Sequence, residues 1–147
     1  MKNVDGDWTV RDTHGRDINF NFCHYAEDEC GDSSDAFAFM KEGRKCLALT
    51  SSEPKAEIAQ AVERDDPKDK SKVQEGIRIT RAGGSECPTD SGVPLSVIFD
   101  VWCDPTALGE PSQIMSADKG PLDDDDADPC TVYISMEHAD GCVLFDL

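Results

Sequence analysis

The sequence lacks the long apolar run that a membrane-spanning helix needs. No segment reaches 18 consecutive apolar residues, whereas about 20 are required to cross a bilayer. The first ten residues, MKNVDGDWTV, are polar from the second position and are not typical of a signal peptide. A removed leader and a cytosolic start are therefore both open on this segment. No N-x-S/T triplet occurs, so we expect no N-linked glycan on these residues.

Basic side chains are scarce. The 147 residues include 14 Lys and Arg against 31 Asp and Glu, which gives a formal net charge of -17. Nucleic-acid affinity comes largely from cationic side chains that displace counterions, so nucleic acid and anionic membrane surfaces are poor partners. Cations, basic proteins and neutral ligands remain candidates. The length is that of one ordinary domain, and we predict a single domain over residues 1–147.

The sequence also lacks the motifs of common catalytic sites, including the G-x-S-x-G elbow and the H-E-x-x-H zinc helix. His24 follows Cys23, but adjacent residues on a strand point to opposite faces and do not form a catalytic pair. His138 has Glu137 and Asp140 nearby in EHADG, where a solvated polar turn is the ordinary interpretation. We therefore predict a protein that is not an enzyme and that needs no cofactor.

An acidic run suggests a calcium site, but its pattern does not fit one. Asp123 to Asp126, together with Asp128, lie in the polar segment 109–129. The EF-hand pattern of alternating Asp residues, a Gly and a later Glu is absent. We therefore predict a solvated, self-repelling acidic loop over 109–129 and no bound metal.

Seven cysteines stand out, and their spacing argues against zinc. They are Cys23, Cys30, Cys46, Cys87, Cys103, Cys130 and Cys142. Zinc sites usually bring two ligands together across a gap of two to four residues, and the shortest gap here, from Cys23 to Cys30, is longer. A disulfide framework in an oxidising compartment is the better interpretation. Cys87 and Cys103 flank an apolar strand, whose extended length is too great for a disulfide between them.

Alternation of apolar and polar residues predicts β-strands along most of the chain. It recurs in RDINFNFCHY, DAFAFM, KCLALTS, EGIRITRA, PLSVIFDVW and CTVYISME. Segment 51–66 fits a short helix and a strand equally well, and segment 63–72 is charged around a proline, as in a loop. The predicted fold is all-β, a flattened antiparallel barrel or sandwich of about eight or nine strands.

The order of these segments resembles the mannose 6-phosphate receptor homology domain. CLALT is followed by GIRITRAGGSEC, then by a Pro-led strand ending in VIFDVWC, an acidic loop, and CTVYISMEHADGC. The resemblance runs from about Asp17 to Asp146, which is where we expect the core of the domain.

The resemblance implies three disulfides that staple the domain. The implied pairs are Cys30 with Cys46, Cys87 with Cys130, and Cys103 with Cys142. Cys23 is then unpaired in this chain, because the family's partner cysteine near the N-terminus has no counterpart in MKNVDGDWTVRD. A shortened N-terminus, a free buried thiol and an intermolecular bridge are the open explanations.

The receptors of this family hold the sugar with a Gln, an Arg, a Glu and a Tyr, and this sequence departs from that set. Pro94 and Leu95 occupy the place of the Arg, and no Gln follows Cys46 in LALTSS. Val132 takes the Tyr position, while Tyr133 lies one residue along and faces the other side of the sheet. The acidic loop leaves the Glu without an alignment.

The resemblance implies a recognition domain rather than an enzyme. We expect the luminal recognition or sorting domain of a receptor-like or autophagy-related trafficking protein, without the classical mannose 6-phosphate contacts. Its membrane span would lie outside this chain, its compartment would be the endomembrane lumen or the cell exterior, and its partner would be a cargo protein or glycoprotein. The alternative is a divergent glycan-binding lectin that uses other residues, for which the candidates are Arg78, Arg81, Tyr133 and Glu137.

Overall fold

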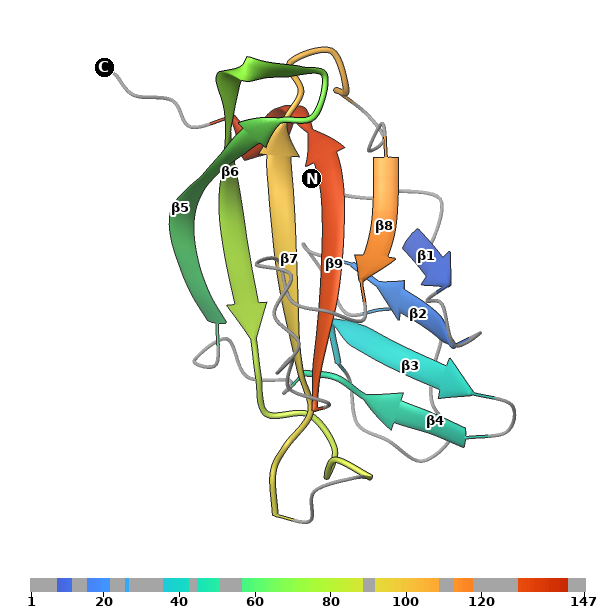
Figure 1. Cartoon of the computed structure of the whole chain (residues 1–147). Helices are drawn as coiled ribbons and strands as arrows, with labels where there is room; N and C mark the ends of the chain where they lie inside the picture. Colours follow the sequence, from blue (N-terminus) through green and yellow to red (C-terminus); the bar gives the residue numbers. More distant parts are fainter. Residues whose placement is uncertain are drawn as a thin grey trace.

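The computed structural model shows an all-β architecture of two sheets (Figure 1). It describes residues 8–11, 16–21, 26, 36–42, 45–50, 57–88, 92–108, 113–117 and 130–142. The four strands of the first sheet are β1 Trp8–Arg11, β2 Asp17–Phe20, β3 Ala38–Glu42 and β4 Lys45–Ala48. The second sheet contains β5 Glu57–Asp66, β6 Asp69–Arg81, β7 Ser96–Cys103, β8 Gln113–Ala117 and β9 Thr131–His138. A single turn of 3-10 helix, η2 Ala139–Gly141, follows β9.

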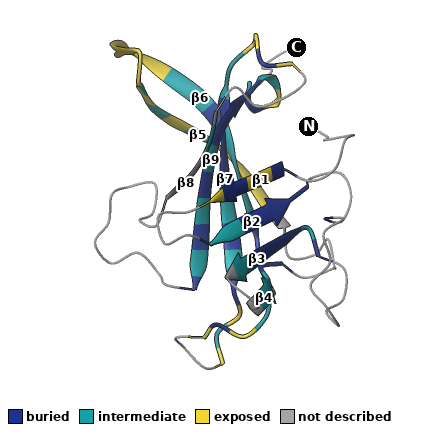
Figure 2. Cartoon of the chain, turned by 90° about the vertical axis from the view of Figure 1, so that its right-hand side faces the viewer, coloured by how far each residue is buried: buried dark blue, intermediate teal, exposed yellow. Residues whose placement is uncertain are grey.

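The first sheet is antiparallel and runs in the order β1-β2-β3-β4. Its strands cross the long strands of the second sheet at a large angle (Figure 2). β1 was not predicted, yet Trp8 and Val10 alternate with exposed residues and enter the hydrophobic core. The hydrophobic core therefore includes two residues ahead of Asp17.

The second sheet has the order β5-β6-β7-β9-β8. All of its pairs are antiparallel except β7 with β9, which run parallel from the Ser96–Thr131 pair to the Cys103–His138 pair. The predicted antiparallel arrangement therefore holds for the other described strand pairs, and this pair is the exception. A parallel pair needs a long connection between its strands, and here residues 104–130, which include β8, separate the two.

Two segments that were predicted as loops contain strands. The charged segment 63–72 continues β5 to Asp66 and starts β6 at Asp69, so that only two residues form the turn. Asp66 Oδ1 accepts a hydrogen bond from Lys68 N at 2.8 Å and so closes this turn. Within segment 109–129, residues 113–117 form β8 on the edge beside β9. The rest of that segment lies outside the described residues.

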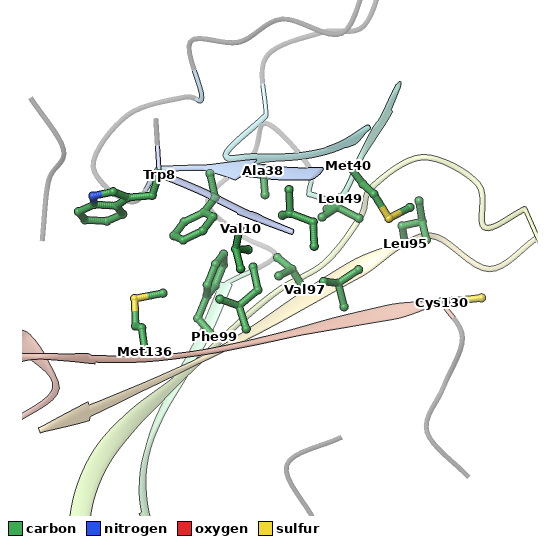
Figure 3. Close-up of a cluster of buried hydrophobic side chains, with 14 of the residues drawn as sticks. Trp8, Val10, Ala38, Met40, Leu49, Leu95, Val97, Phe99, Cys130 and Met136 are labelled. Atoms are coloured by element: carbon green, nitrogen blue, oxygen red, sulfur yellow. The ribbon is translucent and has the colours of Figure 1, made fainter. Parts of the chain in front are cut away.

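The hydrophobic core lies between the two sheets (Figure 3). The alternation predicted for β7 and β9 is present: Val97, Phe99 and Val101 on one strand and Val132, Ile134 and Met136 on the other are buried in it. The rings of Phe20 and Phe99 meet across the sheets, with centroids 5.1 Å apart. Each such fully buried side chain contributes about 1.5–3 kcal/mol of transfer free energy.

The sheets also meet at their edges. Ser85 N donates to Ala48 O at 2.8 Å, and Thr50 bridges Gly83, so β4 is joined to the segment that follows β6. Gly84 permits this approach, since a Cβ there would lie 2.5 Å from Ala48 O. β1 lies against β8 at the other side. These contacts confirm the flattened barrel or sandwich that the strand pattern predicted.

Candidate functional site

One face of the second sheet is turned away from the core and carries a set of polar side chains, here called the outer cluster. The registers place its members on the same face, because directly paired residues of neighbouring strands point to the same side. Arg64 pairs with Gln74, Arg78 pairs with Asp100, and Asp100 pairs with Ser135. The outer cluster consists of Arg64, Gln74, Arg78, Asp100, Trp102, Tyr133, Ser135 and Glu137.

Trp102 is the aromatic centre of the outer cluster. Its indole is buried to 5% exposure between Gly76 beneath and the Arg64 guanidinium above, whose Cζ lies 4.4 Å from the ring centroid. A Cβ at Gly76 would lie 2.7 Å from Trp102 Cε3, so only glycine leaves room for the ring. The indole Nε1 donates to Ser135 Oγ at 3.1 Å. A cation over an indole face contributes about 0.5–2 kcal/mol, more as the pair is desolvated.

Arg64 connects this ring to the acidic end of the cluster. Its Nε donates to Gln74 Oε1 at 2.8 Å, and its Nη2 donates to Glu137 Oε1 at 3.2 Å. Gln74 in turn donates through Nε2 to the carbonyl of Cys103 at 3.0 Å. Burial lowers the pKa of the Arg64 guanidinium from its ordinary value, and the charges of Glu137 and other acidic groups oppose this shift. The network therefore gives its buried polar groups partners.

Arg78 and Asp100 form a second, bidentate pair. Arg78 Nε lies 2.7 Å from Asp100 Oδ1, and Nη2 lies 3.1 Å from Oδ2. The hydrogen bond to Asp100 raises the pKa of Arg78 above its usual value, with burial opposing it. Asp100 is 5% exposed, so its carboxylate depends on this partner.

The structure separates the four residues proposed for the lectin alternative. Arg78, Tyr133 and Glu137 belong to the outer cluster. Arg81 faces the other way and is buried between the sheets, where Nη1 donates to the carbonyl of Asn21 at 3.2 Å. Its guanidinium also lies 4.4 Å from the centre of the Phe37 ring. Arg81 thus joins the two sheets and lies on the opposite face of β6 from the other three candidates.

Five members of the outer cluster were missed from the sequence: Arg64, Gln74, Asp100, Trp102 and Ser135. Arg64 was assigned to a charged loop, and Gln74 follows it on the returning strand. Trp102 lies beside Cys103 in VWC, and its place on the face opposite Val101 follows from the alternation of the strand. That alternation was a usable signal for Trp102, whereas Arg64 reaches the ring only through the curve of the β5–β6 hairpin.

The disulfides hold the ends of the parallel pair of strands. Cys87 is bonded to Cys130 with a Cα separation of 5.5 Å, and Cys103 is bonded to Cys142 with 4.3 Å. These are two of the three pairs that the resemblance implied. Cys46 is also disulfide-bonded. The implied Cys30 partner and the expected unpaired Cys23 lie outside the described residues.

The positions that the resemblance assigns to the sugar contacts are apolar and buried. Leu95, at the place of the Arg, is 2% exposed, and Val132, at the place of the Tyr, is 7% exposed. Both belong to the hydrophobic core. Tyr133 is half-buried on the opposite face of β9, as the alternation predicted.

His138 is buried at the end of β9, and the expectation that it lies in a solvated turn was wrong. The side chain is 2% exposed, and its Nδ1 accepts a hydrogen bond from Asp140 N at 2.9 Å, which caps η2. Its Nε2 has no hydrogen-bond partner among the described residues. The pair formed by Cys23 and His24 lies outside the described residues.

Among the described residues, neither a cluster of metal-binding side chains nor a membrane-spanning helix is found. Within them, no group of three or more His, Cys, Asp or Glu side chains is placed to hold a metal ion. The Asp123–Asp126 run and Asp128, which raised the calcium question, fall outside the described ranges. No helix in the described part of the chain is long and apolar enough to span a membrane.

Comparison with solved structures identifies the fold. Domain 11 of the chicken IGF2R is similar over 96% of this chain and 79% of its own length, with a TM-score of 0.61 and 20% identity. Domain 11 of the echidna mannose 6-phosphate/IGF2R receptor is similar over 99% of this chain and 85% of its own length, with a TM-score of 0.62 and 17% identity. No family model and no curated protein sequence matches the chain. The chain therefore has the fold of a mannose 6-phosphate receptor homology domain.

Proposed function

We propose that this chain is a recognition domain of the endomembrane lumen or the cell exterior, and that it binds a protein or glycoprotein partner without the classical mannose 6-phosphate contacts of the receptors. The buried state of Leu95 and Val132 carries the proposal. An apolar side chain in the core has no hydrogen-bonding group to offer a sugar hydroxyl, and its burial keeps the sugar from reaching it. The receptor-domain fold and the two disulfides support the compartment and the recognition role.

The finer part of the proposal is a sorting role in membrane trafficking, as the luminal part of a receptor-like or autophagy-related protein whose membrane span lies outside this chain. Acidic surfaces of this strength attract basic proteins and repel anionic ligands. A net charge of -17 thus favours a cargo protein with a basic surface over a phosphorylated sugar. The buried capping contact of His138 supports a domain that is not an enzyme.

A divergent lectin is the second candidate, because the outer cluster combines an indole with carboxylates and guanidinium groups. Those groups suit the apolar face and the hydroxyls of a sugar ring. In the structure, however, Arg64 covers Trp102 and is itself bonded to Glu137. The groups that a glycan would need are therefore occupied by one another.

A glycan array at physiological salt separates the two candidates. We expect no dose-dependent signal from the disulfide-intact domain. A glycan that binds in a dose-dependent manner, and whose binding is lost in Arg64→Ala but kept in the surface control Leu108→Ala, would replace the proposal with the lectin.

A further inference from the structure

β5 is the exposed edge of the second sheet. The edge at β4 is joined to residues 83–85, and β8 at the far end of the second sheet lies against β1. On β5, only the side that faces β6 is paired within the described part of the chain. Figure 1 shows this strand along the margin of the sheet. A strand edge of this kind presents a row of backbone N–H and C=O groups to solvent.

Residues 58–62 in the first half of β5 include no lysine, no proline and no bulge, which are features that commonly protect an edge. Ile58 to Val62, with the sequence IAQAV, carry no charge and no proline. The register with β6 is continuous from Glu57 to Asp65, and the one irregularity lies beyond it, between Asp65 and Asp66. Natural edges are usually blunted by lysines, prolines or bulges.

The first half of β5 is exposed to solvent and differs from β6 in its charge. Residues 58–61 are exposed on both faces of the sheet, and Ile58 is 62% exposed. Among the described residues, the part of β6 ahead of Gly76 pairs only with β5, and it carries Lys70 and Lys72. Lysines therefore disfavour the addition of a further strand to the open side of β6, whereas residues 58–62 of β5 carry no such charge.

From this contrast we infer that the β5 edge, residues 58–62, binds an extended segment of a partner protein by β-strand addition. Main-chain hydrogen bonds to the edge would supply affinity, and alternate side chains of the segment would lie over Ile58 and Gln60 on one face and over Ala59 and Ala61 on the other. This inference rests on the proposed function, since it names the surface by which a recognition domain holds a protein partner.

Charge defines the chemistry of that segment. The exposed Glu63 and Asp65 follow the uncharged run, and the whole chain has a net charge of -17. A segment with small or β-branched residues in its middle would pair with the uncharged run 58–62, and Lys or Arg at its ends would attract the acidic residues beside that run.

A second copy of this chain fits the edge poorly. An antiparallel pairing that sets Ile58–Val62 against itself places Glu57 opposite Glu63 at both ends. Like charges directly opposite each other destabilise a strand pair, and two chains of net charge -17 repel. The occupant is therefore a basic extended peptide of another protein.

The test uses a synthetic peptide, acetyl-KKVTVTVKK-amide, titrated into the disulfide-intact domain while backbone amide shifts are followed by NMR. We expect saturable shifts centred on residues 58–62. The same peptide with N-methyl groups on alternate residues keeps its charge but loses edge donors, and we expect its affinity to fall at least tenfold. Equal binding of both peptides would overturn the inference in favour of charge attraction alone.

A protein variant provides a second arm. The double substitution Ala59→Lys with Ala61→Lys adds positive charge at exposed positions of the edge, and we expect peptide affinity to fall at least tenfold while circular dichroism stays unchanged. Leu108→Lys, at a residue that is 77% exposed and away from the edge, is the control and should change affinity less than twofold. Equal losses in both variants would overturn the edge assignment.

Three further outcomes would also overturn it. Shifts centred on the outer cluster would keep protein recognition but move it to another surface. If the domain binds no peptide up to about 1 mM and the glycan array is negative, peptide binding at the β5 edge is refuted and the proposed function stands. If it binds no peptide and the glycan array is positive, both the edge assignment and the proposed function are refuted. A wild-type dimer in ultracentrifugation that Ala61→Lys abolishes would replace the partner by a second copy.

Discussion

Removal of the Cys87–Cys130 bridge tests how far the disulfides stabilise this fold. The two cysteines are 43 residues apart in the sequence and are 2% and 1% exposed. The chain-entropy relation gives about 4 kcal/mol for a closed loop of that length. A domain of this size has a free energy of unfolding of about 5–15 kcal/mol, so the loss is a large share of the total. We expect Cys87→Ala with Cys130→Ala to lower Tm by about 8–16 °C.

The assay is urea unfolding at pH 7, followed by tryptophan fluorescence, with the free energy extrapolated to zero urea. The matched comparison is Cys103→Ala with Cys142→Ala, whose sequence separation of 39 predicts nearly the same loss. Both double variants should remain folded but weaker, and reductant should then have a smaller further effect on each. A loss below about 1 kcal/mol in both would refute the reasoning and show that the core between the sheets suffices.

Three other predictions concern packing and charge. Phe99→Ala removes a fully buried ring that meets Phe20 and should cost about 3–5 kcal/mol in the same assay, far more than Leu108→Ala at the surface. Gly84→Ala forces a Cβ to within 2.5 Å of Ala48 O and should separate β4 from residues 83–85, so faster amide exchange at Ser85 is expected and unchanged exchange would contradict it. Arg78→Ala leaves the buried Asp100 without its bidentate partner and should cost about 1.5–3 kcal/mol; the added Asp100→Ala substitution should restore part of the loss, and strict additivity would show that the pair is not coupled.

The strands that line the core were predictable because their signal is local. Val97 and Phe99 alternate with side chains of the other face, and burial of one face is what produces such a pattern. β5 gave no such signal, because residues 58–61 are exposed on both faces and no core selects for alternation there. Its strand conformation follows from pairing with β6, which local composition does not record.

The candidate site was predictable only in part, for related reasons. Val132 and Tyr133 were placed on opposite faces from the period of two, and the structure agrees. The same rule places Arg78 and Arg81, which are three residues apart on β6, on opposite faces of the sheet. The contact between Arg64 and Trp102 depends on the curve of a hairpin over a neighbouring strand, and no sequence pattern states that distance.

The central claim is that this receptor-type fold recognises a partner without the sugar contacts of the receptors, and titration calorimetry with mannose 6-phosphate tests it most directly. A missing hydrogen bond forfeits about 0.5–1.5 kcal/mol when it is neutral and about 1.5–3 kcal/mol when one partner is charged. The apolar Leu95 and Val132 stand where the resemblance assigns the Arg and the Tyr contact. The account predicts no heat of binding for the disulfide-intact domain at micromolar ligand. A Kd at or below about 10 μM, near -7 kcal/mol, would contradict it.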